Sequence, residues 1–155
     1  MLRLKKKDLE KMYIQASAEY PAECCGILTM AANAGASTVH ACSNIQDQLH
    51  AADPEKFPRD ARIAYYIDSQ ELYNIVSGAE KAGGAVSGFF HSHIDCDAYF
   101  SDEDKERAMI WDEPAYPDAV YPVISVYNGQ VKDYKCFAWN EAKRDFVEVE
   151  IDVIG

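Results

Sequence analysis

Residues 91–104 read HSHIDCDAYFSDED, and this stretch decides which fold the chain adopts. It overlaps an apolar and aromatic run over residues 85–93, which is typical of a buried strand. His91 and His93 stand two positions apart near the end of that run. Alternate side chains of a strand point to the same face, so both imidazoles can reach one point. Taken alone, the pair is also compatible with a chance occurrence beside a loop.

A carboxylate follows the two histidines at the start of a predicted helix. Ser101 is a good N-cap residue for a helix that is expected to run to about Trp111. Asp102 and Glu103 suit the first turn of that helix, and Asp104 lies one turn inside it. By itself the acidic cluster is typical of a solvated helix start. A catalytic zinc site needs a third protein ligand besides two histidines, and the joint spacing makes Asp104 able to supply it.

In the rest of the chain, on both sides of residues 91–104, the predicted short strands outnumber the predicted helices. Regular alternation of strand and helix is missing after Trp111, which argues against a doubly wound fold. We expect a mixed, sandwich-like α+β architecture in a single domain over residues 1–155. The other expected elements, in chain order, are a helix at 4–18, strands at 24–30 and 37–43, a polar loop at 44–59, a β-rich run at 61–67, a helix at about 70–82 capped by Asp68 or Ser69, and strands at 119–127, 131–139 and 145–153.

Composition argues against several classes of partner. The 15 basic and 26 acidic residues give a net charge of −11, which argues against nucleic acid and anionic membrane surfaces. No run approaches the roughly 20 apolar residues of a membrane-spanning helix, and residues 1–7 lack the apolar run of a signal peptide. The five cysteines form no C-x-x-C pair, so we expect reduced thiols in a cytoplasmic protein.

The motif consists of His91-Ser92-His93, seven further residues, Ser101, two residues and Asp104. It matches the pattern H-S/T-H-x7-S-x2-D. In this motif the chain resembles the JAMM metalloproteases, also called MPN+ domains, and the resemblance extends over nearly its whole length. Residues 21–28, PAECCGIL, and the segment 44–57 look like those of the compact prokaryotic members. The resemblance implies a single MPN domain with a cytidine-deaminase-like fold, in which helices flank a central mixed β-sheet.

The resemblance also implies a role for each of five side chains. His91, His93 and Asp104 would bind Zn²⁺, with water as the fourth ligand and its pKa lowered towards about 7. Glu23 would accept the proton of that water and pass it to the leaving amine; without the other four residues it would be an ordinary strand-end charge. Ser101 would place its hydroxyl near the developing oxyanion, although its residue type is also that of a plain helix cap.

Two positions depart from the family pattern. Family members often have proline after the second histidine and before the serine, where this chain has Ile94 and Phe100. Both positions lie outside the expected metal ligands, so metal binding should survive. The loop between them should lose stiffness and present a different lip to the substrate. Cys96 in this loop is close enough in sequence to swing toward the metal, but a free loop thiol is the simpler interpretation.

By this resemblance, the expected activity is that of a zinc-dependent peptidase or isopeptidase. Its substrate would be the bond after the C-terminal Gly-Gly of a ubiquitin-like or sulfur-carrier protein, whose extended tail would pair with a strand edge beside the metal. The alternative is a non-catalytic MPN-type protein-binding domain, but such domains lack ligands and all five positions are filled here. A zinc deaminase would need H-x-E and P-C-x-x-C, and both are missing. The sequence leaves open which carrier is cleaved, whether the bond is peptide or isopeptide, and the oligomeric state, for which a homodimer is one option.

Overall fold

The computed structural model describes all 155 residues and is built around one six-stranded sheet. The strand order is β3-β2-β4-β7-β8-β9, with β4 and β7 parallel and every other neighbouring pair antiparallel. This confirms a mixed central sheet in an α+β fold. The strands are β2 (Cys25–Met30), β3 (Thr38–Cys42), β4 (Ala85–Ile94), β7 (Val120–Tyr127), β8 (Gln130–Asn140) and β9 (Asp145–Val149).

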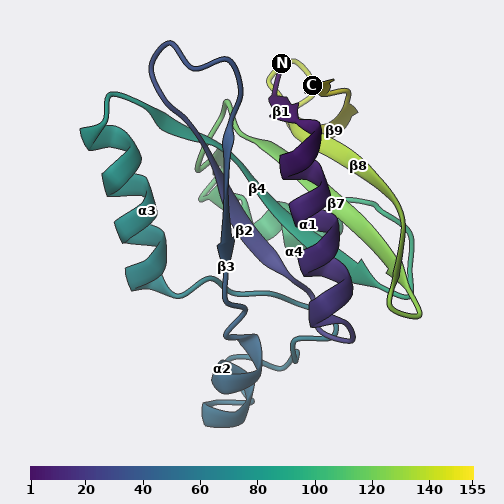
Figure 1. The fold of residues 1–155 in the computed structure, drawn as a ribbon. Coiled ribbons are helices and arrows are strands. Elements are labelled where there is room, and N and C mark those ends of the chain that lie inside the picture. Colours follow the sequence, from purple (N-terminus) through teal and green to yellow (C-terminus); the bar gives the residue numbers. More distant parts are fainter.

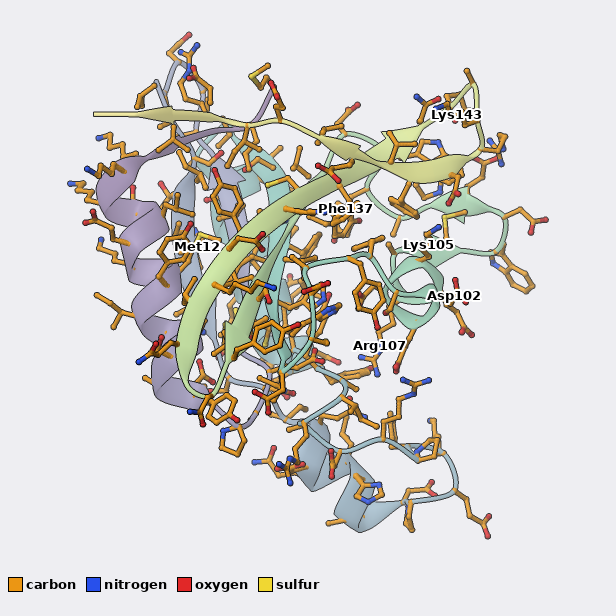
Figure 2. All side chains as sticks on the ribbon, turned by 90° about the vertical axis from the view of Figure 1, so that its right-hand side faces the viewer. Met12, Asp102, Lys105, Arg107, Phe137 and Lys143 are labelled. Carbon is orange, nitrogen blue, oxygen red and sulfur yellow. The ribbon has the colours of Figure 1, made fainter.

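Helices cover both faces of the sheet. On one face lies α1 (Lys6–Glu19), and on the other lie α3 (Ser69–Lys81) and the short α4 (Asp102–Arg107). Figure 2 shows the layers from the side, with Met12 of α1 on one side of the strands and α4 on the opposite side. None of the helices is both long and apolar enough to cross a membrane. A fourth helix, α2 (Gln46–Ala52), lies beyond the end of the sheet (Figure 1).

The face under α1 carries the larger hydrophobic core. Leu9, Met12 and Ala16 of the helix are buried, as their helical spacing predicts. They pack in one cluster with Leu28 of β2 and Phe90 of β4, among other strand residues. Neighbouring residues of these strands point the other way, since side chains alternate across a sheet. The two faces of the sheet therefore carry different sets of residues.

The opposite face is more aromatic and more open. Phe100 contacts the rings of Tyr121, Phe137 and Phe146, and this group forms a core beside α4. A third, smaller cluster around Ile27 packs beneath α3. The helix α3 has no fully buried residue, although Asp68, one of the two predicted cap residues, caps it by accepting hydrogen bonds from the first turn.

The chain termini are joined by a pairing that the sequence does not reveal. The short strand β1 (Arg3–Lys5) pairs in parallel with β10 (Asp152–Ile154), and both termini lie at the same end of the molecule (Figure 1). The expected strand at 145–153 is therefore divided between β9 and β10. By contrast, the tight turn between β7 and β8 is as predicted, because Asn128 and Gly129 both adopt the positive φ of a two-residue hairpin.

The region between β3 and α3 differs from the prediction. The polar segment 44–59 contains helix α2, and the β-rich segment 61–67 forms no strand apart from a single bridge between Asn44 and Ile67. The reason is the Asn44 side chain. It donates to the carbonyl of Ala64 and accepts from the N–H of Tyr66, so it takes the place of a neighbouring strand.

Helix α4 ends earlier than predicted. Its last residue is Arg107 rather than Trp111, and the chain continues into a small hairpin of β5 (Met109–Ile110) and β6 (Glu113–Pro114). Trp111 lies at the hairpin tip with a positive φ and is almost fully exposed. Pairing of β5 with β6 satisfies backbone groups that a longer helix would otherwise have used.

Candidate metal centre

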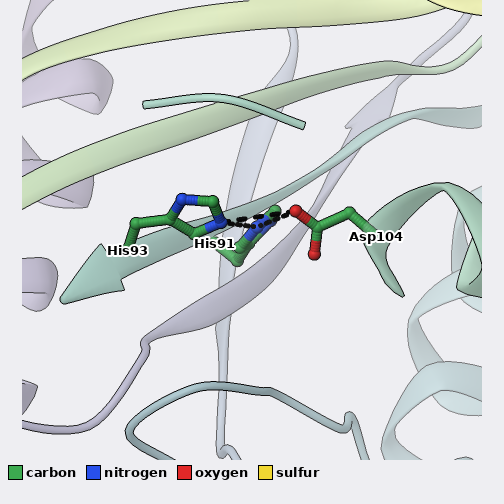
Figure 3. Close-up of side chains that lie close together, drawn as sticks. All are labelled: His91, His93 and Asp104. Carbon is green, nitrogen blue, oxygen red and sulfur yellow. Dashed lines mark hydrogen bonds and ion pairs between the residues drawn. The ribbon is translucent and has the colours of Figure 1, made fainter. Parts of the chain in front are cut away.

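Three side chains from β4 and α4 meet at one buried point (Figure 3). The Nε2 atoms of His91 and His93 lie 3.2 Å apart. The Oδ2 atom of Asp104 is 3.2 Å from the first and 3.3 Å from the second. All three residues are buried. The structure thus brings together the three residues that the sequence motif singles out as metal ligands.

The spacing of these atoms fits a tetrahedral metal site. Zinc bonds of roughly 2.0–2.1 Å place tetrahedral ligand atoms about 3.3–3.4 Å apart, close to the observed edges. The tautomer of one ligand is also suitable. Nδ1 of His93 donates to the carbonyl of Asp97 at 3.1 Å, which leaves Nε2 as the ring nitrogen directed at the site. Two imidazoles and one carboxylate form a donor set that zinc accepts, and the residues fit the ion.

A capping box aims Asp104 at the histidines. The N–H of Asp104 donates to Oγ of Ser101 at 3.1 Å, and the N–H of Ser101 donates to Oδ2 of Asp104 at 3.0 Å. The helix start therefore holds the carboxylate in a fixed rotamer. Burial by itself raises the pKa of Asp104, but contacts with His91, His93 and the Ser101 N–H outweigh it and hold the pKa below its usual range. Burial lowers the pKa of His91, which favours the neutral, metal-binding ring.

Two tyrosines that the sequence analysis missed frame the histidines. The ring of Tyr65 stacks on His91 with centroids 4.7 Å apart, and Tyr99 meets His93 edge-on at 4.8 Å. The Nδ1 atom of His91 is buried without a hydrogen-bond partner. His93 is thus oriented by a hydrogen bond, whereas the orientation of His91 rests on packing against Tyr65. No local sequence signal marks Tyr65, because the contact joins residues 26 positions apart.

Arg107 links the segment that carries Tyr65 to helix α4. Its guanidinium donates to the backbone carbonyl of Tyr65 and pairs with Glu103 at 3.3 Å. It also lies over the rings of Tyr65 and Tyr66, with centroid distances of 5.9 and 5.4 Å. The spacing of Glu103 and Arg107 is a recognisable i, i+4 pair, whereas the contact with Tyr65 is visible only in the structure.

Glu23 lies beside the three candidate ligands but outside the group that they form. Its side chain is buried, and its carboxylate is outside the group formed by the histidines and Asp104. Cys25 of β2 is directly opposite His91, and the N–H of Ser92 donates to the carbonyl of Cys24 at 3.1 Å. Continuing this register by one residue places Glu23 opposite His93, on the same face of the sheet. Burial raises the pKa of Glu23 well above its usual range, and the negative charge of Asp104 adds to the effect.

The loop at residues 94–100 is fixed by contacts that replace the missing prolines. Phe100 is buried in the aromatic core beside α4. Asp95 accepts hydrogen bonds from Tyr20 and from the N–H of Asn128, at 2.8 and 2.9 Å. Cys96 is outside the ligand group, and its carbonyl accepts a hydrogen bond from the Ser125 hydroxyl. Where family members often have prolines next to this loop, packing and side-chain hydrogen bonds hold the loop in this chain.

Comparisons with known proteins show similarity over most of the chain. Residues 5–140 match the family described as prokaryotic homologs of the JAB domain. A curated protein from Haloferax volcanii named desampylase is 35% identical over 111 residues, which cover 71% of this chain and 67% of that protein.

Solved structures give the same relationship at the level of the fold. A protein from Desulfitobacterium hafniense superimposes with a TM-score of 0.70 at 25% identity, covering 99% of this chain and 92% of that one. A JAB1/MPN domain protein from Archaeoglobus fulgidus gives a TM-score of 0.53 at 15% identity, with full coverage of both chains.

Proposed function

Because the chain belongs to the family of prokaryotic homologs of the JAB domain, we propose that it is a zinc-dependent isopeptidase. Its substrate in this proposal is the bond after the C-terminal Gly-Gly of a ubiquitin-like or sulfur-carrier protein. The observation that carries the proposal is the convergence of His91, His93 and Asp104 on one buried point. The name desampylase, given to the relative from Haloferax volcanii, supports an activity on isopeptide bonds.

His91, His93 and Asp104 are the proposed metal ligands, and each is prepared for that role. Both histidines project from the same face of β4, and Asp104 is held by the capping box at the start of α4. Bound there, Zn²⁺ supplies Lewis acidity toward the substrate carbonyl and lowers the pKa of water towards about 7. The protein contributes a dry, fixed ligand set, since all three side chains are almost entirely removed from solvent.

Glu23 is the proposed general base. Its raised pKa gives the carboxylate a stronger tendency to accept a proton than an exposed glutamate has. A buried carboxyl group that has gained a proton can donate it in the next step to the leaving amine. Since Glu23 is outside the ligand group, it remains available for proton transfer.

Ser101 is the proposed donor to the negative charge that develops on the substrate oxygen. In the capping box its Oγ accepts a hydrogen bond from the N–H of Asp104, which uses a lone pair and leaves the hydroxyl proton available. The same side chain can therefore cap the helix and donate a hydrogen bond. A donor fixed in this way stabilises the transition state by up to several kcal/mol.

The substrate tail is proposed to cross the face of the sheet that carries α3 and α4. The expected pairing of the tail with a strand edge beside the metal cannot involve β4. Both edges of β4 are already paired, with β2 on one side and β7 on the other. The tail therefore cannot join β4 as an additional strand, and strand pairing near the site would have to use a free edge, such as that of β3 or of the β5–β6 hairpin.

The proposal is tested with a carrier protein whose Gly-Gly terminus is joined to a short peptide or to a lysine side chain. The zinc-loaded protein should cleave one or both fusions and leave casein intact. Changing the last glycine to alanine should slow cleavage strongly, because a β-carbon would crowd the buried site. Binding of the carrier without any cleavage would instead indicate a non-catalytic MPN-type binding domain. Equal rates on all substrates, casein included, would contradict carrier specificity.

A further inference from the structure

A cavity of about 270 Å³ opens beside the metal centre, between α3 and α4. Asp104 lines this cavity and also contributes the carboxylate of the metal centre, so the two sites share a wall. The cavity is bordered mainly by aromatic rings, and we call it the tyrosine cavity. Its aromatic residues are Tyr65, Tyr66, Phe89, Tyr116 and Tyr121.

The size of the tyrosine cavity matches one bulky side chain. An apolar cavity of about 150 Å³ in another protein admits benzene, whereas pockets for drug-sized ligands have roughly 300–1,000 Å³. The observed volume of about 270 Å³ lies between these values. It is therefore large enough for an aromatic or branched aliphatic side chain, and it is smaller than the pocket of a whole cofactor.

The charges in the wall argue for a non-polar occupant. Arg107 is the one basic residue of the wall, and its guanidinium is already paired with Glu103 and with the carbonyl of Tyr65. Asp104 is the one acidic residue, and its Oδ2 is directed to the two histidines. Neither charge is available for an incoming ion, so a charged side chain would lose its hydration without gaining a partner.

The tyrosine cavity continues along α3. Ser69, Leu72 and Tyr116 border it and also border a neighbouring hollow that contains Tyr73 and Val76. The apolar side chains of α3 are only half-buried or exposed, which leaves a path for an extended segment from the cavity along the helix. A peptide that has its scissile bond at the metal can therefore place a nearby side chain in the cavity.

We propose that the tyrosine cavity binds a bulky non-polar side chain of the substrate tail, a few residues before its Gly-Gly terminus. This rests on the proposed function and adds a second determinant of specificity to it. The carrier tail is the constant part of such substrates, whereas the leaving amine changes from one target to the next. A preformed cavity that accepts one kind of side chain therefore suits the carrier tail better than the variable leaving group.

The inference is tested with tail peptides and fusions in which leucine, alanine or aspartate occupies successive positions before the Gly-Gly. Free peptides ending in Gly-Gly report binding by calorimetry without any turnover. At one position we expect leucine to bind best. There, kcat/KM of the fusion should fall about 10–200-fold for alanine and further for aspartate.

Variants of the protein show whether the tyrosine cavity is responsible. Ala115 is half-buried in the cavity wall, and Ala115→Leu should fill the space and remove the preference for leucine. Ala36→Leu is the matched control, since Ala36 is equally half-buried in the turn between β2 and β3. If Ala115→Leu does not fold, Ser69→Phe narrows the cavity from an exposed position on the other wall.

The two proposals fail in different ways. Peptide binding that ranks leucine first and is lost in the filled variant, without cleavage of any fusion, supports the cavity and overturns the proposed activity. Cleavage of all three fusions at equal rates, with equal peptide affinities at every position, overturns the cavity assignment and leaves the proposed activity standing. An unchanged leucine preference in both Ala115→Leu and Ser69→Phe also overturns it.

Discussion

The two faces of the central sheet are built from different chemistry. The face under α1 holds a cluster of twelve buried residues that are mostly aliphatic, with Phe90 as its one aromatic member. The face under α3 and α4 holds stacked aromatic rings, the tyrosine cavity and the buried ionisable groups Glu23, His91, His93 and Asp104. Helix α1 has three buried residues, and α3 has none.

Because of this difference, one face of the sheet mainly contributes to the stability of the fold, and the other carries the candidate functional groups. Buried ionisable groups cost free energy, and a half-covered helix contributes less burial than a fully packed one. The hydrophobic core on the α1 face can offset both of these free-energy costs, because the strands that carry the ionisable groups on one face also bury apolar residues on the other. Substitutions on the α1 face should therefore alter the free energy of unfolding. Substitutions on the α3 and α4 face should mainly alter activity or metal binding.

The largest expected effect is that of Glu23→Gln. The amide keeps the shape of the side chain and cannot accept a proton, so kcat should fall about 10²–10⁴-fold while zinc remains bound. The matched control on the α1 side is Glu19→Gln, since burial also raises the pKa of this carboxyl. It should leave kcat unchanged. Loss of zinc from Glu23→Gln would show that Glu23 is a ligand and would contradict the proposed mechanism.

A pair of core truncations compares the two faces directly. Met12 is fully buried under α1, so Met12→Ala should lower the free energy of unfolding by about 2–5 kcal/mol. Ile75 on α3 is only half-buried, and Ile75→Ala should cost about 1 kcal/mol. Urea denaturation of both variants measures the difference. Equal losses would mean that the two helices contribute equally to stability, and would contradict the expected difference between the two faces.

A smaller effect is expected at Tyr65, whose ring stacks on His91. Tyr65→Leu removes the stacking and should weaken zinc binding about 10-fold, the lower end of the effect of removing a group that orients a metal ligand. Tyr65→Phe keeps the ring and should bind zinc normally. Competition with a chromophoric chelator measures the dissociation constants.

The control for Tyr65 is an aromatic residue on the other face. Tyr134 pairs with Tyr13 under α1 at a centroid distance of 6.1 Å. Tyr134→Leu should therefore affect stability and leave zinc affinity unchanged. If Tyr65→Leu and Tyr134→Leu weaken zinc binding equally, the effect comes from general loosening of the fold and not from the orientation of His91.

Local patterns in the sequence predict much of this fold. The spacing of Leu9, Met12 and Ala16 predicts α1, Asp68 predicts the start of α3, and Asn128-Gly129 predicts the hairpin between β7 and β8. In each case the determining interaction lies within a few residues along the chain. The same holds for the capping box that directs Asp104, which is why residues 91–104 are so informative.

Predictions fail where distant residues decide the local structure. Residues 61–67 have the composition of a strand, but several of their backbone groups bond to side chains from other segments, namely those of Asn44, Asp47 and Arg107. The pairing of β1 with β10 joins residues about 150 positions apart. Around the candidate site, Tyr65 and Arg107 were missed for the same reason, because Tyr65 stacks on His91, which lies 26 positions away, and Arg107 bonds to the Tyr65 carbonyl, which lies 42 positions away.

The central claim is that His91, His93 and Asp104 hold a zinc ion, and metal analysis tests it most directly. Protein purified without added metal should contain one zinc per chain by elemental analysis. The double variant His91→Ala, His93→Ala should contain none, while circular dichroism shows that its fold is retained through the intact α1 face. Full zinc occupancy in the double variant would contradict the assignment.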